Sequence, residues 1–174
     1  MVLSIEQKSV YLTILDATMI LRTVGRSLRS EDRLKEFKNK VFKELEGLFN
    51  KMEVGKLTDN DILHSIDKFC EQFGISFGQA QKAINVLLKY HYYMYEKYFD
   101  DCIKIKSVLH CPLDSTNLER LGIINNPLTR INKKEYKDIQ NNIQNKMQSL
   151  GLNKIDFDKL FDKDFLRRRG IEDF

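Results

Sequence analysis

The chain has 174 residues, of which 42% are hydrophobic and 31% charged, a balance typical of a single globular domain. Its net charge of +4 is too small for the footprint of a dedicated nucleic-acid-binding domain. The three cysteines show no CxxC spacing, which argues against a disulfide framework and favours reduced thiols in a cytoplasm. No apolar run is long enough to predict a transmembrane helix, so we expect no membrane partner.

Apolar residues recur at helical spacing along most of the chain. The first predicted helix covers residues 10–24, whose charged residues and flanks do not fit a signal peptide. The second begins after Ser30, a good N-cap. The third begins at Thr58, with Asp61 three residues later in a variant of the capping box, and ends at Gly74.

The fourth predicted helix begins at Phe77 or Gly78 and carries a run of aromatic residues between positions 90 and 99. These rings either pack among neighbouring helices or form a surface on which nucleic-acid bases stack. Residues 100–107 alternate apolar and polar side chains, which favours an irregular connection with a short extended segment.

The C-terminal part predicts three further helices. A short helix covers residues 115–121, a polar helix with a thin apolar stripe covers residues 133–150, and a last helix lies within residues 156–174. No internal repeat or linker divides the chain. The sequence therefore predicts one all-α domain over residues 1–174, with about six or seven helices and with residues 150–174 as a docked C-terminal helix.

The chain lacks the familiar motifs of catalytic and cofactor sites. No Walker motif, GxGxxG, HExxH or GxSxG occurs. His110, Cys111 and Asp114 lie close together in the sequence, but their spacing matches no zinc signature. We therefore expect no metal and no cofactor.

Two segments each place one charged residue at the start of a predicted helix. Residues 78–88 read GQAQKAINVLL and put Lys82 in the first turn of an apolar helix. Residues 111–122 read CPLDSTNLERLG and put Asp114 just after Pro112, at the start of the short helix. A lysine amine can act as a nucleophile, and a nearby carboxylate can shuttle protons and stabilise positive charge. The two residues are therefore a candidate catalytic pair.

These segments resemble the core of the helix-hairpin-helix DNA glycosylases, in which a glycine-containing hairpin runs into a helix. The resemblance implies that the lysine matching Lys82 attacks the sugar of a flipped-out nucleotide and that the aspartate matching Asp114 assists. It also implies a helix-hairpin-helix-like centre whose amides bind a DNA phosphate, formed here by Gly78, Gln79, Ala80 and Gln81. The spacing of the two segments requires an insertion around residues 100–106.

The same segments are similar to a set of uncharacterised prokaryotic proteins. These share the GQAQK helix start and a His-x-Pro-x-Asp-Ser turn, represented here by His110, Pro112, Asp114 and Ser115. No activity is attached to that set. The similarity therefore supports the two segments as one structural unit and does not bear on catalysis.

The leading hypothesis is a small DNA-contacting helical protein, a relative of DNA glycosylases or lyases, with a basic cluster of Arg130, Lys133 and Lys134 as further contacts. The alternative is a non-enzymatic protein–protein interaction module, of a phage- or defence-associated kind, that binds through its C-terminal helices. In that case the aspartate is a helix cap, the lysine is a solvated side chain, and the basic cluster is ordinary surface. The sequence leaves open whether the protein is an enzyme.

Overall fold

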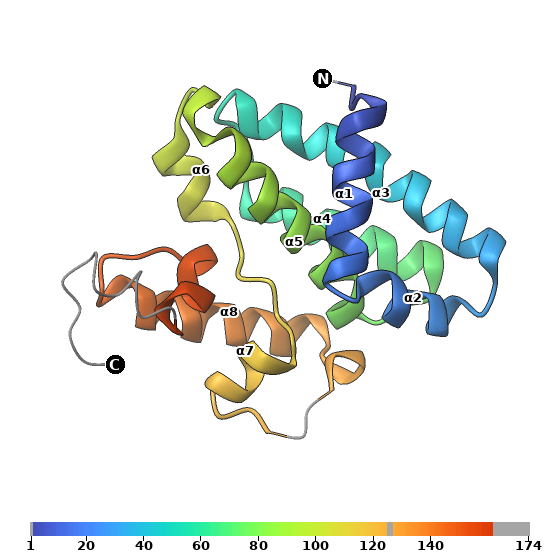
Figure 1. Ribbon diagram of the computed structural model, residues 1–174. Coiled ribbons are helices and arrows are strands. Elements are labelled where there is room, and N and C mark those ends of the chain that lie inside the picture. Colours follow the sequence, from blue (N-terminus) through green and yellow to red (C-terminus); the bar gives the residue numbers. More distant parts are fainter. Residues whose placement is uncertain (1, 125–126, 162–174) are drawn as a thin grey trace.

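The computed structural model describes residues 2–124 and 127–161 (Figure 1). All regular elements in these residues are helical, so the predicted all-α class is confirmed. The N-terminal half contains α1 (Ile5–Ala17), α2 (Ile20–Leu28), α3 (Glu31–Glu53) and α4 (Asp59–Phe73). The remainder contains α5 (Phe77–Tyr95), η1 (Glu96–Tyr98), α6 (Cys102–Val108), α7 (Ser115–Arg120), η2 (Leu128–Arg130), α8 (Lys133–Gln148) and η3 (Lys154–Phe161).

Several helices begin and end where the sequence predicts. The Ser30 side chain accepts a hydrogen bond from the Arg33 amide at the start of α3. Thr58 and Asp61 form the predicted capping box at the start of α4, and Gly74 ends this helix in the left-handed conformation, with φ 64°. In these places local side-chain chemistry decides the boundary.

The predicted continuous helix over residues 10–24 is wrong, because the chain breaks between α1 and α2. Met19 adopts a left-handed conformation with φ 60°, which a non-glycine residue rarely takes. The Thr18 hydroxyl donates to the Ile14 carbonyl (2.7 Å), a local bond that competes with helix continuation. The buried residues are Tyr11 and Leu15 in α1 and Ile20, Val24 and Leu28 in α2, so both helices pack into the core on either side of the break.

The expected irregular segment at residues 100–107 is also corrected, since most of it is the helix α6. The Asp101 side chain caps this helix by accepting a hydrogen bond from the Lys104 amide (2.9 Å). Ile105 is buried, whereas Ile103 exposes 80% of its surface. The alternating apolar pattern therefore arises from a helix that buries only one of the two isoleucines.

Helix α5 lies at the centre of the molecule and contacts α1, α2, α3, α4 and α8. Most of the side chains along its first four turns are buried. Near its C-terminal end, the ring of His91 stacks on Phe49 with centroids 3.6 Å apart. Tyr92 is buried as well, so part of the aromatic run serves the core, as one of the two sequence interpretations expects.

An extended segment, residues 109–114, connects α6 to α7, and we call it the strap. Figure 1 shows it passing from α6 to α7 beside α8. Leu109 and Asp114, at its two ends, have extended backbone angles. The strap brings the start of α7 to the side of the molecule where α5 begins.

The C-terminal elements dock on the helices before them. The apolar stripe of α8 is buried, as are Ile155, Phe157 and Leu160 of η3. Asp156 of η3 accepts a hydrogen bond from the Tyr93 hydroxyl (2.6 Å) and pairs with the Lys106 ammonium (2.9 Å). Residues 154–161 form a 3-10 helix packed on these helices, and the rest of the predicted C-terminal helix, residues 162–174, lies outside the described residues. Over the described ranges, no helix combines the length and the apolar character needed to cross a bilayer.

Candidate functional site

The structure brings Lys82 and Asp114 to the wall of one pocket, of about 500 Å³. Three further parts of the chain contribute to this wall: the α1–α2 turn with Met19, η2 with Leu128, and η3 with Asp158. The two helix starts that the sequence singles out therefore share one concave surface. We call it the Lys82 pocket.

Lys82 is half-buried in the first turns of α5, between the buried side chains of Gln81 and Ala83. The helix start is fixed by a capping box in which Ser76 and Gln79 exchange hydrogen bonds. Among the described residues, no carboxylate oxygen, including those of Asp114, lies within 4.0 Å of the Lys82 ammonium. The amine is thus held at the pocket wall without an ion-pair partner in the described part of the chain.

Asp114 is the N-cap of α7, which confirms the capping interpretation of this residue. Its Oδ1 accepts a hydrogen bond from the Asn117 amide (2.9 Å). A cap occupies one carboxylate oxygen and leaves the second for another partner. Capping and a role in the pocket are therefore compatible.

A second lysine in the same pocket is paired. Lys89, on α5 two turns beyond Lys82, forms an ion pair with Asp158 of η3. This contact makes the C-terminal segment part of the pocket wall. Of the two lysines in this pocket, Lys82 is therefore the one without an ion-pair partner among the described residues.

The four residues expected to bind a DNA phosphate are buried. Gly78 lies against η2 so closely that a Cβ atom on it would be 1.9 Å from the Leu128 carbonyl oxygen. The amides of Gln79 and Ala80 both donate to the Ser76 carbonyl oxygen, at 3.1 and 3.0 Å. The predicted phosphate contact at Gly78, Gln79, Ala80 and Gln81 therefore lacks an accessible group here, because η2 covers the helix start.

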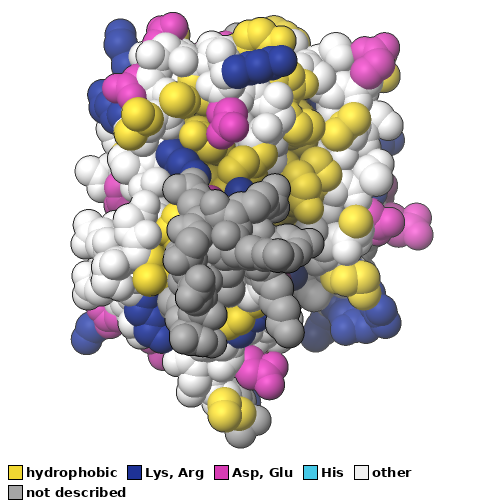
Figure 2. All heavy atoms as spheres, turned by 60° about the vertical axis from the view of Figure 1, so that its left-hand side comes forward, with side chains coloured by type: hydrophobic (Ala, Val, Ile, Leu, Met, Phe, Trp, Pro, Cys, Tyr) yellow, Lys and Arg dark blue, Asp and Glu magenta, His cyan; other side chains and the backbone are white. Residues whose placement is uncertain are grey.

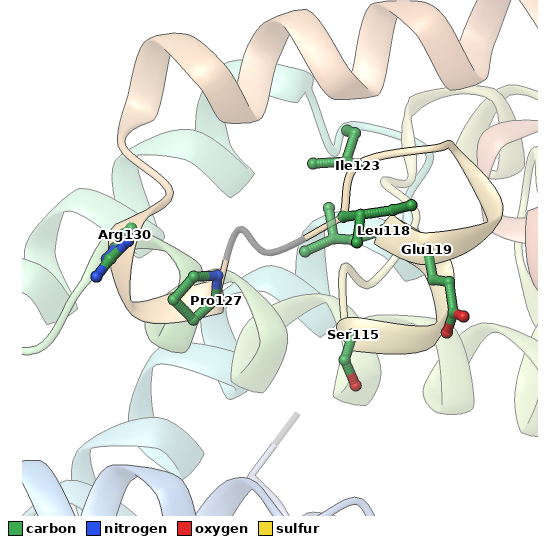
Figure 3. Close-up of a pocket in the computed structure, with 7 residues that line it drawn as sticks. Ser115, Leu118, Glu119, Ile123, Pro127 and Arg130 are labelled. Atoms are coloured by element: carbon green, nitrogen blue, oxygen red, sulfur yellow. The ribbon is translucent and has the colours of Figure 1, made fainter.

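The predicted basic cluster is divided between two places. Arg130 is exposed on η2 and lines a neighbouring pocket of about 440 Å³ (Figure 3). Ser115 lines this pocket and the Lys82 pocket alike, so the two adjoin. Lys133 instead pairs with Asp67 of α4 (2.5 Å), and Lys134 is exposed on α8. Of the three predicted contacts, Arg130 is the one that lies beside the candidate site.

Two glutamines hold the strap in place. The Gln81 side chain accepts from the Leu113 amide (3.1 Å) and donates to the Leu113 carbonyl oxygen (2.9 Å). Gln140 of α8 does the same at Cys111, at 3.1 and 2.7 Å. Each glutamine thus satisfies both backbone groups of one strap residue, which a buried extended segment requires.

A buried chain of hydrogen bonds runs from α5 to the surface of α4. The Asn85 amide donates to the Tyr136 hydroxyl (2.7 Å), which lies 2.6 Å from His110 Nδ1. His110 Nε2 in turn contacts the Asp59 carboxylate. A neutral histidine with its proton on Nε2 completes this chain, with the tyrosine donating to Nδ1.

Burial and hydrogen bonding shift the pKa values of the ionisable groups in and beside this series of hydrogen bonds. Burial lowers the pKa of His110, and its contact with Asp59 opposes that shift. The hydrogen bond from His110 holds the pKa of the Asp59 carboxyl below its usual range. Burial also raises the pKa of the Cys111 thiol, so this residue is a poor metal ligand at neutral pH. Within residues 2–124 and 127–161, no three His, Cys, Asp or Glu side chains are grouped to hold a metal ion.

The sequence does not predict these contacts to the strap. The pairing of Gln140 with Cys111 joins residues far apart in the chain, and neither belongs to a motif. One signal is present on α5, where Gln81 and Asn85 stand four residues apart on the side that packs into the core. Polar side chains in such positions need buried partners, so the spacing predicts a polar contact without naming the partner.

Figure 2 shows one face of the molecule, on which basic, acidic and hydrophobic side chains are intermingled. Among the described side chains visible on this face, those of lysine and arginine lie apart from one another.

No protein family, no curated protein and no solved structure matches this chain. The resemblance to the DNA glycosylases therefore stays a prediction. The case for a function rests on the geometry of the Lys82 pocket.

Proposed function

We propose that this protein contacts DNA at the Lys82 pocket, as a small helical relative of DNA glycosylases and lyases. One observation carries the proposal: a lysine without an ion-pair partner among the described residues and a helix-capping aspartate line the same pocket. The proposed ligand is the sugar of an abasic nucleotide turned out of the duplex, because a stacked nucleotide cannot enter such a site.

The size and lining of the pocket suit a sugar. Its volume of about 500 Å³ falls within the range of small-molecule sites. Val86, Pro112 and Leu128 supply apolar wall, while Lys82 and Asp114 supply charge. A sugar presents the same combination of apolar ring faces and polar groups.

The proposed chemistry begins with the Lys82 amine. It adds to the C1′ aldehyde of the ring-opened abasic sugar, and loss of water leaves an imine. The second oxygen of Asp114 accepts a proton from C2′, and the C3′–O bond breaks with its electron pair, releasing the 3′ phosphate. The step needs no oxidant, reductant or metal.

Arg130 is the proposed contact to a flanking phosphate. It is exposed and lies in a pocket that shares Ser115 with the Lys82 pocket. A guanidinium binds a phosphate with two parallel hydrogen bonds. The buried start of α5 has no part in this proposal.

Binding to a short duplex with one abasic site, followed by fluorescence anisotropy against salt concentration, tests the proposal. We expect affinity to fall with salt, since cations are released from the DNA. Arg130→Ala should flatten the salt slope by about 0.9 if it contacts one phosphate. Lys56→Ala, which removes an exposed lysine from the α3–α4 connection, is the matched control for the loss of one charge. No binding at low salt rejects the proposal.

The second candidate is a protein–protein interaction module, and an exposed apolar ridge favours it. Tyr90, Met94 and Tyr98 follow one another at four-residue spacing along α5 and η1, and they expose 45%, 39% and 68% of their surface. The stripe of α8, by contrast, is buried within the chain. If the ridge binds a second copy, Met94→Ser should lower the mass measured by sedimentation at high concentration. Either candidate would act in the cytoplasm, where the thiols stay reduced.

A further inference from the structure

The Gln81 side chain of α5 binds the Leu113 backbone of the strap, and each of these residues directly precedes one of the two charged residues of the pocket. Gln81 directly precedes Lys82, and Leu113 directly precedes Asp114. Both hydrogen-bonding groups of the Gln81 side chain engage the backbone of Leu113, at 3.1 and 2.9 Å. Lys82 and Asp114 are therefore each one peptide bond away from the same two-point contact.

This contact is rigid on both sides. Gln81 is fully buried, and its amide also donates to the Gly78 carbonyl oxygen (2.9 Å) while its oxygen accepts from Asn85 (3.1 Å). Leu113 is fully buried as well. A two-point contact between immobile groups fixes separation and rotation together, whereas a single hydrogen bond leaves rotation free.

The other strap contacts serve a different segment. Gln140 engages Cys111, three residues before Asp114, and comes from α8 rather than from the helix that carries Lys82. It holds the strap against α8 but does not connect the two pocket residues. The chain thus offers two buried glutamines with the same bonding pattern and different consequences for the pocket.

We infer that Gln81 is a positioning residue that holds Lys82 and Asp114 at a working separation across the pocket. The inference rests on the proposed function of that pocket.

A zero-length cross-link tests the inference without DNA. A carbodiimide activates the Asp114 carboxylate, the Lys82 amine attacks it, and an amide forms as the urea leaves. Peptide mapping by mass spectrometry measures the yield of the Lys82–Asp114 amide in wild type, Gln81→Met and Gln140→Met. Each variant loses one pair of hydrogen bonds to the strap. A general loss of stability should therefore lower the yield in both variants, whereas a loss of positioning should lower it in Gln81→Met alone.

We expect the amide in wild type and in Gln140→Met, and a yield about tenfold lower in Gln81→Met, because a small displacement of reacting groups costs much of their effective concentration. Equal yields in all three proteins, equal losses in the two variants, or no amide in wild type would each overturn the inference. If the cross-links follow the expected pattern but no DNA binds, the proposed function fails and the positioning role stands.

Hydrogen exchange covers the case in which Gln81→Met does not fold. In wild type the Leu113 amide should be protected, since Gln81 accepts its hydrogen. The shorter side chain of Gln81→Asn should speed exchange at Leu113 more than at Cys111, and Gln140→Met should do the reverse. Rapid exchange at Leu113 in folded wild type contradicts the inference.

Discussion

The two halves of α5 are buried in different ways. Around its start, the buried side chains of Gln79, Gln81 and Asn85 are polar and make hydrogen bonds to neighbouring segments. Around its end, His91 lies among aromatic rings, including those of Phe49 and Tyr11. Hydrogen bonds are directional and fix position, whereas ring packing supplies most of the stabilising free energy. The Lys82 pocket begins beside the polar half, at Lys82, and continues along α5 to Tyr90.

The largest expected effect is at the aromatic end. Phe49→Ala removes a fully buried ring that stacks on His91 and contacts Tyr11. The free energy of unfolding should fall by about 3–5 kcal/mol, as measured by urea denaturation at neutral pH. Phe161→Ala, at a ring that is 41% exposed, is the control and should cost much less. Similar losses in the two variants would contradict the assignment of stability to the aromatic end.

The second prediction concerns acid. Burial lowers the pKa of His91 to about 3, while a histidine in the unfolded chain titrates near 6.5. Below pH 6.5 the unfolded state therefore binds more protons, and the free energy of unfolding falls by about 1.4 kcal/mol per pH unit from this residue, levelling off near pH 3. The lowered pKa of His110 adds in the same direction.

The variant His91→Phe distinguishes the contribution of His91 to the pH dependence of stability from that of His110. It keeps a ring beside Phe49 and Tyr11 and removes the titrating group, so the mean slope of stability against pH between 6.5 and 5 should decrease by about 1.1 kcal/mol per pH unit. Urea denaturation at pH 7, 6 and 5 measures it. An unchanged slope would mean that His91 is not held neutral in the folded protein.

The third prediction is at the polar half. Tyr136→Phe deletes the hydroxyl that lies between Asn85 and His110. Because the histidine nitrogen then lacks a donor inside the protein, we expect a loss of about 1–3 kcal/mol in the free energy of unfolding. Tyr90→Phe removes an exposed hydroxyl and should change little. If both changes are equally mild, the buried chain of hydrogen bonds does not contribute to stability.

The smallest expected change in stability distinguishes the two roles of Asp114. Asp114→Ala should cost about 1 kcal/mol through loss of the α7 cap, and Asp114→Asn should restore most of it, since asparagine caps equally well. Activity on abasic DNA should be lost in both variants, because neither retains the carboxylate. An Asp114→Asn variant that is stable and fully active would leave the residue as a cap alone.

Local signals in the sequence predict much of the fold. Ser30, Thr58 and Gly74 mark helix ends through chemistry that acts within a few residues. The sequence does not predict the break at Met19, because apolar spacing does not report a change in helix direction. It does not predict the helix after Asp101 either, because the alternating apolar residues favour an extended segment over the one that the cap starts. Helix boundaries are therefore predictable where a cap and a periodic stripe agree.

The sequence predicts those parts of the candidate site that depend on local signals. Lys82 and Asp114 are visible as charged residues at helix starts, and the structure places both at one pocket. The strap contacts of Gln81 and Gln140 join distant segments, so no local pattern predicts them. The packing of Leu128 against Gly78, at the helix start that the glycosylase resemblance implies as a phosphate contact, depends on tertiary structure and is also absent from any local pattern.

Reductive trapping on DNA tests the central claim most directly. Sodium borohydride reduces an imine between Lys82 and an abasic sugar to a stable amine, which leaves a covalent protein–DNA complex visible on a denaturing gel. We predict that wild type and Lys56→Ala form the complex, that Lys82→Ala does not, and that peptide mapping locates the bond at Lys82. No complex with wild type, or an equal amount with Lys82→Ala, would contradict the assignment of this pocket as a DNA lyase site.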